Sequence, residues 1–530
     1  MTDRAPECPK LLDWPVAVLT LLSIPIIFYR LGSYSLVNGD EGLYHYVARH
    51  MLEAGEWFRL EFTGEHRVYD TFMNAPIHYW AKAVLIAAFG DSYWTMRILS
   101  AAFGLLSVLM TYRLAGYLAN RWAAFVAGLL QLTTVQFIYL HGARTGEMET
   151  IVTFFITLAA YLLLRALERG RSFVPHFICL AVLANLKLPL VIVPIAADFL
   201  FLTLTRAARS RLRGWALTGL AILPLGLAWH IGQALAIGDQ FWQVMGTMTR
   251  QASAGSDFGA ETTLGVIIGN ALFYGQVILF GAFPMAVAYP FAIVGVLASG
   301  EGPRQRRALR LPLVYAATVV AYFAVVAQHY PWYIIPMYPF LSALLAIWLE
   351  RLRRAAPNTP VVLAASVILA LLLWLHVEIR SFNPFAVVAR EIQGETSWRE
   401  LLPVPLWLGF PVSVLVLAGL LHNAVLLWRA RSARAIAYGL VVILIGLAGV
   451  RTLHPLEYTE NQSDLARLRA RITEAEAAGE TLDYPIPVPE FAPLKVRYYF
   501  GDDFDIRVMR QDGGLRFFLY PKDKPRPASY

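Results

Sequence analysis

Charged residues are scarce in this sequence. Of its 530 residues only 15% are Asp, Glu, Lys or Arg, while 57% are hydrophobic, and the mean hydropathy is +0.52. A soluble globular chain of this length needs more charge than this to cover its surface. The composition therefore excludes an ordinary soluble enzyme and indicates a protein that lies largely within a membrane.

Cysteine and nucleotide-binding motifs are also lacking. The two cysteines, Cys8 and Cys179, lie in the polar N-terminal tail and in a long apolar run, so the sequence offers no disulfide framework and no cysteine-rich metal site. There is no G-x-x-x-x-G-K-[ST] loop and no strand-borne G-x-G-x-x-G. A soluble nucleotide as co-substrate is therefore disfavoured.

The net charge of +8 does not indicate a nucleic-acid partner, because the arginines do not form one basic face. They lie instead in short clusters between apolar runs, which is the pattern of a membrane protein. No period of 20–50 residues recurs along the chain, so neither solenoid nor transporter repeats are visible. We expect membrane lipids as partners and no nucleic acid.

Apolar stretches near the length that crosses about 30 Å of hydrocarbon recur from Trp14 to Val450, and about thirteen meet this criterion. The first has no small-residue cleavage site behind it, so we interpret it as a retained helix and not as a signal peptide. The sequence thus predicts an α-helical polytopic membrane protein. The expected spans cover roughly 12–30, 93–118, 122–140, 150–165, 173–187, 189–205, 214–236, 265–298, 311–328, 332–349, 360–376, 403–428 and 435–451.

Five loops between the expected spans carry 17 Arg against 3 Glu, and all five fall on one side of the membrane. The positive-inside rule makes that side cytoplasmic. The other side receives residues 31–91, with 8 acidic residues against 4 Lys or Arg. We therefore expect a multi-pass protein of the inner or plasma membrane with a cytoplasmic N-terminus. The five loops are 165–171, 206–213, 301–310, 350–354 and 429–434.

The composition changes after residue 452. The tail holds 13 acidic and 11 basic residues, with a helix-like SDLARLRARITEAEAA followed by the β-leaning runs PLKVRYYF, DIRVM and GLRFFLY. We therefore predict two domains. Residues 1–452 form the transmembrane domain, and residues 453–530 form a small soluble α+β domain on the outer face.

The first outer loop, residues 31–91, carries the most specific polar pattern. Asp40 and Glu41 come directly after the first span and precede YHYVARHMLEAG, whose amphipathic spacing predicts a helix on the membrane interface. A carboxylate there has lipid below and water above it and can act as a general base on a hydroxyl. On spacing alone the plainer interpretation of Asp40 as a helix cap is favoured, because N-caps are far commoner than catalytic acids.

Seven elements follow one another in an order that resembles the polytopic C-type glycosyltransferases related to protein O-mannosyltransferases and to the bacterial lipid A aminoarabinose transferase. The resemblance covers roughly residues 12–350 and continues as topology to about 451. The elements are DEGLY, PIHYW, SYWTMRILSAAFGLLSV, ARTGEMETIVTFF, LANLKLPLVIVP, LAWHIGQALAIGDQFW and HYPWYIIPMYPF. Enzymes of this family transfer a sugar from a polyprenyl-phosphate carrier to an acceptor on the outer face.

The resemblance implies catalytic roles for three acidic residues. It makes Asp40 the catalytic base, with Glu41 beside it, and it places Glu149 of ARTGEMET at the second acidic position of the family. A direct displacement at the anomeric carbon with inversion would follow.

The resemblance also implies residues that contact the donor. Arg144 lies five residues before the second acid, Lys187 and Pro189 match a Lys-Gly-Pro element, and Tyr333 matches a tyrosine near the carrier phosphate. Lys187 is flanked by apolar residues and is expensive within a membrane unless it has a partner or a function. We add His329, which lies near an outer turn, to these substrate-binding candidates.

This chain departs from aminoarabinose transferases at two cationic positions. Met73 and Asn74 replace an acid-lysine pair, and Leu43 replaces an arginine that follows the acidic pair. Other cations must therefore meet the carrier phosphate. Each outer cation also has the plainer interpretation of a snorkelling or solvated side chain, which is least convincing for the intramembrane lysine. The candidates are Arg49, Arg67, Arg97, Lys187 and Arg250.

The histidines do not form a metal motif. None makes a tight H-x-x-x-H pair with a nearby acid, although His45 lies four residues from Glu41 on one helix face. We predict no cofactor, with a bound divalent cation as the less favoured alternative. The outer-side histidines are His45, His50, His66, His78 and His329.

The sequence thus predicts a hexosyl- or pentosyltransferase that moves a sugar from a polyprenyl-phosphate donor to an envelope lipid, glycan or protein. Two alternatives remain open. A transporter or flippase of a lipid-linked glycan would also have many spans and intramembrane charges such as Lys187 and Asp198, but it would not need the carboxylate pair or an outer domain. A polytopic ligase would move a whole oligosaccharide.

Overall fold

The structure is a computed structural model that describes about two thirds of residues 1–452 and parts of the C-terminal tail. The expected spans over 360–376 and 403–428, and the domain boundary expected at 452, lie outside the described residues. The described residues are 13–33, 36, 39–58, 75–168, 170–205, 208–239, 241–243, 245–246, 263–297, 303–326, 329–354, 441, 445, 464–478, 486–488, 504–511 and 514–521.

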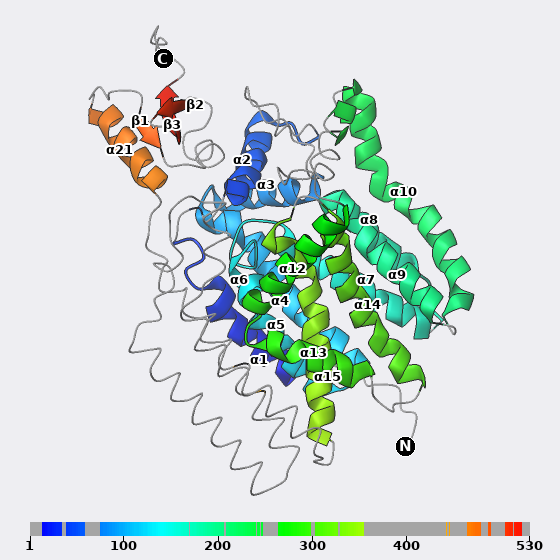
Figure 1. The fold of residues 1–530 in the computed structure, drawn as a ribbon. Helices are drawn as coiled ribbons and strands as arrows, with labels where there is room; N and C mark the ends of the chain where they lie inside the picture. Colours follow the sequence, from blue (N-terminus) through cyan, green and yellow to red (C-terminus); the bar gives the residue numbers. More distant parts are fainter. Residues whose placement is uncertain are drawn as a thin grey trace, which may run out of the picture.

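The chain enters the bundle through two consecutive helices and then forms two more at one end of the molecule. The expected first span is α1 (Trp14–Ser23) followed directly by the π-helix η1 (Ile24–Phe28). The predicted interfacial helix is α2 (Gly39–Ala54), which packs on α3 (Ile77–Phe89). Both lie at the same end of the bundle (Figure 1).

Four helices form the centre of the bundle. α4 packs on the other three, and α15 also packs on α5. The first ten residues of α15 are all buried. The span expected over 122–140 is interrupted, because the chain leaves the helix at Thr133 and Thr134 before the short α6 (Val135–Tyr139). The four are α4 (Tyr93–Leu118), α5 (Arg121–Leu132), α7 (Glu149–Glu168) and α15 (Tyr338–Arg354).

The apolar run 174–204 forms a hairpin of two helices. α8 (Val174–Lys187) and α9 (Ile192–Leu204) are joined by the 3₁₀ turn η3 (Leu188–Val191). His176 near the start of the run lies 2.7 Å from Asp198 near its end, so the two helices run in opposite directions. Two helices thus form where the sequence predicts two spans, within a run that is one candidate span by length and composition, and the chain turns directly after Lys187.

Outer helices complete the bundle. The single span expected over 265–298 is wrong in one respect, because residues 282–284 interrupt it and two helices result. Gly226 of α10 allows that helix to approach α8 closely, since a Cβ there would lie 2.9 Å from the Cα of Ala181. The remaining helices are α10 (Leu212–Ile237), α12 (Thr263–Gly281), α13 (Met285–Leu297), α14 (Pro303–Val325) and the 3₁₀ helix η5 (Pro331–Met337), which leads into α15.

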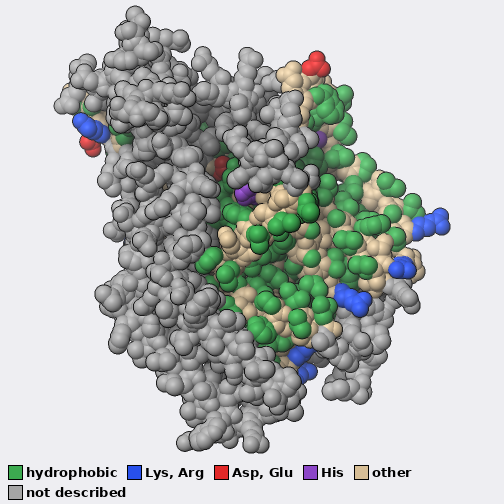
Figure 2. Space-filling view, in the orientation of Figure 1, with side chains coloured by type: hydrophobic (Ala, Val, Ile, Leu, Met, Phe, Trp, Pro, Cys, Tyr) green, Lys and Arg blue, Asp and Glu red, His purple; other side chains and the backbone are tan. Residues whose placement is uncertain are grey.

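Length and composition make six of the described helical segments long and apolar enough to cross a membrane. A band of apolar side chains covers the visible face of these helices, and Lys and Arg gather toward the end away from α2 (Figure 2). The arginines that begin α10 and end α15 belong to this basic end. The protein is therefore an α-helical polytopic membrane protein, as the sequence predicts.

The described part of the C-terminal tail contains one helix and a small sheet. The helix α21 (Asp464–Ala478) and the strands β2 (Phe504–Gln511) and β3 (Gly514–Pro521) match three of the four predicted runs, and the fourth lies outside the described residues. The sheet is antiparallel with the order β1-β3-β2, where β1 is Ile486–Val488. These elements lie toward the same end as α2 (Figure 1).

Candidate active site

Asp40 lies in the first turn of α2, which begins one residue earlier at Gly39. Its side chain is only partly buried, and its carboxylate makes no hydrogen bond within the part of the chain that the structure describes. The position in the first turn favours a negative charge, because the helix dipole is positive there. Asp40 therefore offers an unoccupied carboxylate at the end of the bundle that carries α2 and α3.

Glu41, the next residue, accepts three hydrogen bonds from two partners. Arg97 of α4 donates to both of its carboxylate oxygens, from Nε at 3.1 Å and from Nη2 at 2.9 Å, and both side chains are fully buried. The backbone N–H of Gly146 donates to the same carboxylate at 3.0 Å. The two neighbouring acids thus have opposite environments, and the catalytic role predicted for Glu41 stays a prediction.

The local sequence explains how Arg97 reaches Glu41. Ser92 and Thr95 form a reciprocal capping box that starts α4, so Arg97 follows in its second turn. The absence of a side chain at Gly146 matters equally, because a Cβ there would lie 2.9 Å from the Cβ of Glu41. The ion pair therefore joins α2, α4 and the loop 140–148.

Arg144 lies in this loop and is buried. Its Nη1 donates to the carbonyls of Ile26 and Ile27 at 3.2 and 3.1 Å, and its Nη2 donates to the carbonyl of Tyr29 at 2.8 Å. These carbonyls end η1, where helical partners run out. The structure therefore places the guanidinium on the backbone of the first span, and the predicted contact of Arg144 with substrate is untested.

Glu149 opens α7 and bridges two basic side chains. Lys187 at the end of α8 donates to its Oε1 at 3.0 Å, and Nδ1 of His141 lies 3.8 Å from its Oε2. Glu149 and His141 are buried, while 20% of the Lys187 side chain remains exposed. Two residues predicted from the sequence thus meet across 38 positions of the chain.

Aromatic rings of η5 form one wall of this site. The ammonium of Lys187 lies 5.7 Å from the ring centroid of Tyr333, within the range of a cation–π contact. Trp332 stacks on His141 with centroids 3.7 Å apart and an interplanar angle of 5°, and Tyr330 stacks on Trp332 at 4.7 Å. The predicted proximity of Lys187 and Tyr333 is therefore present in the fold.

The charges around Asp40 act in opposite directions. Burial raises its pKa from the ordinary value, the positive charge of His141 lowers it, and the negative charge of Glu149 raises it again before Lys187 lowers it. Burial alone would lower the pKa of His141, but the nearby carboxylates, Glu147 first, outweigh burial and raise it to about 9. The carboxylates around His141 therefore favour its imidazolium form.

Three residues near the site carried no signal in the sequence analysis as a catalytic or binding group. Trp332 and Glu147 belong to stretches that matched the family as whole elements, and His141 lies two residues before one of them. Glu147 is fully buried, and neither of its carboxylate oxygens has a hydrogen-bond partner among the described residues. Burial raises the pKa of Glu147 to about 7 despite the opposing charge of His141.

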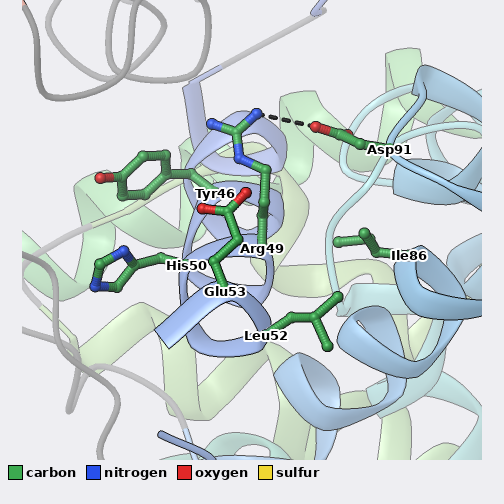
Figure 3. Close-up of a pocket in the computed structure, with 7 residues that line it drawn as sticks. All are labelled: Tyr46, Arg49, His50, Leu52, Glu53, Ile86 and Asp91. Carbon is green, nitrogen blue, oxygen red and sulfur yellow. Dashed lines mark hydrogen bonds and ion pairs between the residues drawn. The ribbon is translucent and has the colours of Figure 1, made fainter. Parts of the chain in front are cut away.

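The other predicted site residues are dispersed. The ring of His329 is half-buried against Phe273 at a centroid distance of 4.9 Å, and Arg250 and Arg67 lie outside the described residues. Arg49 donates to Asp91 at 2.9 Å across a surface hollow of about 400 Å³ between α2 and the end of α3 (Figure 3). Arg49 is paired with Asp91 and Arg97 with Glu41, so neither adds an unengaged cation to the site.

The described residues contain no candidate metal site. No group of three or more His, Cys, Asp or Glu side chains there has the proximity that a metal ion requires. The expectation that the protein needs no cofactor stays a prediction, as does the alternative of a divalent cation.

An apolar groove leads away from the site along the bundle. It lies between α9 and α14, has a volume of about 400 Å³ and contains almost no polar surface. One end of the groove lies at Ile192, which is five residues after Lys187. Tyr322 lines the same end, and the ring of the next residue, Phe323, stacks on Tyr333 at a centroid distance of 4.7 Å. The lining residues are Ile192, Ala196, Leu200, Leu204, Val314, Ala317, Thr318, Ala321 and Tyr322.

Comparison with known proteins finds similarity in sequence and in fold. Residues 73–231 match the model of a family described as dolichyl-phosphate-mannose-protein mannosyltransferase. An uncharacterised protein of Aquifex aeolicus (strain VF5) is 26% identical over 339 residues, which are 62% of this chain and 63% of that protein. The match thus spans less than two thirds of the relative's length.

Two solved structures share the architecture. The crystal structure of ArnT from Cupriavidus metallidurans bound to undecaprenyl phosphate superposes with a TM-score of 0.67 at 16% identity, covering 96% of this chain and 99% of ArnT. The apo state of the same protein gives a TM-score of 0.63 at 17% identity, covering 95% and 97%. Residues 73–231 are therefore similar to the dolichyl-phosphate-mannose-protein mannosyltransferase family, and this multi-pass membrane protein has the fold of ArnT.

Proposed function

We propose that this protein transfers a single sugar from a polyprenyl-phosphate carrier to an acceptor hydroxyl on the outer membrane face, with Asp40 as general base. Asp40 takes the proton of the hydroxyl, the oxygen attacks the anomeric carbon, and the bond from that carbon to the phosphate oxygen breaks with inversion. The phosphate leaves with the bonding electrons. The proton then passes from Asp40 to water, which the partial exposure of this side chain permits.

One observation carries the choice of Asp40. Of the three acids predicted to be catalytic, Glu41 is bound by Arg97 and Gly146, and Glu149 is bound by Lys187. Asp40 alone of these three keeps both oxygens unoccupied and is partly exposed. A general base must accept a proton at an available lone pair, so Asp40 is suited to the reaction and the other two are suited to positioning.

Lys187 supplies positive charge on the donor side. It is held at the outer end of the α8 turn by Glu149 and by the face of Tyr333, and a fifth of its side chain remains accessible. An ammonium held in place in this way stabilises the negative charge that develops on a departing phosphate. The ArnT structure, which contains undecaprenyl phosphate, supports a carrier of this class.

The groove between α9 and α14 suits the carrier's tail. From Ile192 to Leu204 it follows the 13 residues of α9, or roughly 20 Å at about 1.5 Å per residue, and its walls are apolar. A polyprenyl chain in it has its phosphate end near Lys187. The tail therefore stays within the hydrocarbon layer while the sugar reaches Asp40.

The orientation that this function needs follows from the charge distribution. Basic residues at the ends of α9, α10 and α15 mark the cytoplasmic side, so Asp40 lies on the outer side of the inner or plasma membrane. The C-terminal domain then lies on the outer face as well, where the acceptor is an envelope lipid, a glycan or a protein.

The direct test is Asp40→Asn in purified protein that is supplied with polyprenyl-phosphate sugars and envelope extract. The amide is nearly isosteric but cannot take the proton, so we expect folded protein and loss of transfer by at least about 100-fold, the lower range for general-base catalysis. Glu53→Gln is the matched control, because Glu53 is an exposed carboxylate on the same helix. Full transfer by Asp40→Asn would contradict the proposal, and loss of folded protein would favour a capping role.

A further inference from the structure

We propose that Gln136 is a positioning residue for the donor side of this site. Its side-chain amide holds both ends of η5 and thereby keeps the ring of Tyr333 against the ammonium of Lys187. The inference rests on the proposed function, because it concerns the place proposed for the carrier phosphate. Gln136 lies in α6 and is not among the residues that the sequence or the family resemblance indicates as functional.

η5 is a segment that its own hydrogen bonds support poorly. A 3₁₀ helix has poorer hydrogen-bond geometry than an α-helix, and runs longer than about three or four residues are uncommon. η5 extends over seven residues, and Pro331 and Pro336 have no N–H to donate. It nevertheless carries Trp332 and Tyr333, whose rings contact His141 and Lys187. Contacts from outside η5 are therefore needed to fix the position of these rings.

The amide of Gln136 makes such contacts at both ends of the segment. Its Nε2 donates to the carbonyl of Pro331, the first residue of η5, and its Oε1 accepts from the phenol of Tyr338, the residue directly after η5. Gln136 and Tyr338 are both buried. One side chain thus joins the two ends of η5 through a donor and an acceptor, a combination that neither an ionised carboxylate nor an apolar side chain provides.

The sequence around Gln136 explains how its amide comes to face η5. The hydroxyls of Thr133 and Thr134 donate to carbonyls in the last turn of α5, at 2.9 Å each, and the chain leaves the helix there before α6 begins. Gly281 at the end of α12 makes room for the amide, because a Cβ there would lie 2.1 Å from Oε1 of Gln136. The break in the helix and the missing side chain on α12 together allow the contact with η5.

α6 also anchors the loop that faces Trp332. The N–H groups of Ala143 and Arg144 donate to carbonyls of α6 at 2.8 and 2.9 Å. His141, in the same loop, stacks on Trp332 with centroids 3.7 Å apart. Gln136 therefore links the helix that anchors this loop to the segment that carries the stacked indole.

A displacement of η5 would reach Lys187 through Tyr333. The ammonium lies 5.7 Å from the centroid of the Tyr333 ring, close to the limit of about 6 Å for a favourable cation–π contact, so a small movement of the ring weakens the contact. Lys187 would keep its hydrogen bond to Glu149. We therefore expect weaker binding of the carrier phosphate and not the complete loss of the site.

The experiment measures the affinity of the full-length protein for undecaprenyl phosphate by titration in detergent. Gln136→Met keeps the length of the side chain but removes both hydrogen bonds. We expect the affinity to fall by about three- to thirtyfold, the range that corresponds to the loss of a cation–π contact.

The matched control is Gln131→Met, which makes the same change in a buried amide five residues earlier. Gln131 accepts from Ser342 of α15 at 3.3 Å and has no hydrogen bond to η5 among the described residues. This variant should bind undecaprenyl phosphate as wild type.

A double substitution distinguishes positioning from a general loss of stability. If Gln136 acts through the Tyr333 ring, Gln136→Met should cause no further loss of affinity in a Tyr333→Leu background. A merely structural role would lower the midpoint of thermal unfolding but would leave the affinity of the folded protein unchanged. Tyr338→Phe removes one of the two hydrogen bonds and should weaken binding by a smaller factor, and it provides the test if Gln136→Met does not fold.

Wild-type affinity in folded Gln136→Met, or in Tyr338→Phe if the first variant does not fold, overturns the inference. An additive loss in the double variant or an equal loss in Gln131→Met also overturns it. Lys187→Met separates these results from the proposed function. If Lys187→Met binds as wild type, the phosphate does not lie at Lys187, and the proposed donor site fails together with the inference. If Lys187→Met binds weakly and Gln136→Met binds as wild type, only the inference fails.

Discussion

At the scale of single residues, the site depends on the different surroundings of two adjacent carboxylates, those of Asp40 and Glu41. Glu41 is fully buried and bound by Arg97 in a bidentate pair, whereas Asp40 is left available. A buried ion pair contributes less to stability than its Coulomb attraction suggests, because both charges lose their hydration. Removal of only one partner of the pair is nevertheless costly, because the charge of the other partner then stays buried without compensation.

The Glu41 pair predicts a clear contrast in stability. Arg97→Met leaves the Glu41 carboxylate buried without its main partner, and we expect the free energy of unfolding to fall by about 3–5 kcal/mol. Arg49→Met removes a partly exposed partner of Asp91, which His45 still binds at 2.6 Å, and should cost less than about 1 kcal/mol. Thermal unfolding in detergent compares the two. Equal destabilisation would show that the buried pair does not hold α2 to α4.

Lys187 predicts a contrast in carrier binding. Lys187→Met keeps the apolar contacts of the stem but removes a charge-assisted contact of about 1.5–3 kcal/mol, so affinity for polyprenyl phosphate should fall roughly tenfold to over a hundredfold. Tyr333→Phe keeps the ring under Lys187 and should bind nearly as wild type. Titration in detergent measures both. Unchanged affinity of Lys187→Met would assign the lysine to packing and leave the phosphate to another cation.

At the scale of helices, the sequence predicted what periodicity and apolar length determine. The span 93–118 coincides with α4, and the two spans on either side of Lys187 are the α8–α9 hairpin. The break at residues 282–284 was missed, because hydropathy does not fall there even though the helix ends.

Contacts between distant helices were beyond what the sequence alone could predict. The resemblance indicated Glu149 and Lys187 separately, but their ion pair depends on where η3 turns the chain. His141 and Glu147 were missed for a similar reason. Neither has a spacing signature, and their importance arises only when the loop 140–148 folds against α2 and η5.

The α9–α14 groove predicts a dependence on carrier length. Ala317→Trp fills the groove with a large ring, so KM should rise for a long polyprenyl donor and stay near wild type for a donor with a short soluble tail. Leu235→Trp on α10 is the control, because this side chain is 82% exposed outside the groove. Transfer assays with both donors give the comparison. If the two donors are affected equally, the tail does not occupy this groove.

At the scale of the whole molecule, charge is distributed unevenly along the bundle. Arginines gather at the end of the bundle where α10 begins and α15 ends, which is the end away from α2 (Figure 2). The contact of Arg211 with the carbonyl of Arg171, at 2.8 Å, brings two of the basic loops together. This asymmetry is the basis for placing the active site outside.

The orientation can be checked with a reporter that is active only outside the cytoplasm. It should be silent when fused at residue 209 or 353 and active when fused after residue 530, because the arginine-rich loops stay inside. A cytoplasmic reporter at the same three positions is the matched control and should give the opposite pattern. Outside activity at residue 353 would invert the orientation and remove Asp40 from the outer face.

The measurement that tests the central claim most directly is mass spectrometry of membrane lipids and envelope glycans from cells that contain wild-type protein, Asp40→Asn or no protein. The account predicts that the last two accumulate a polyprenyl-phosphate monosaccharide and lose, from one envelope component, the mass of one sugar. Accumulation of a carrier with a whole oligosaccharide would point to a ligase. Unchanged lipids and glycans in cells with Asp40→Asn, against a change in cells without the protein, would contradict transfer by this carboxylate.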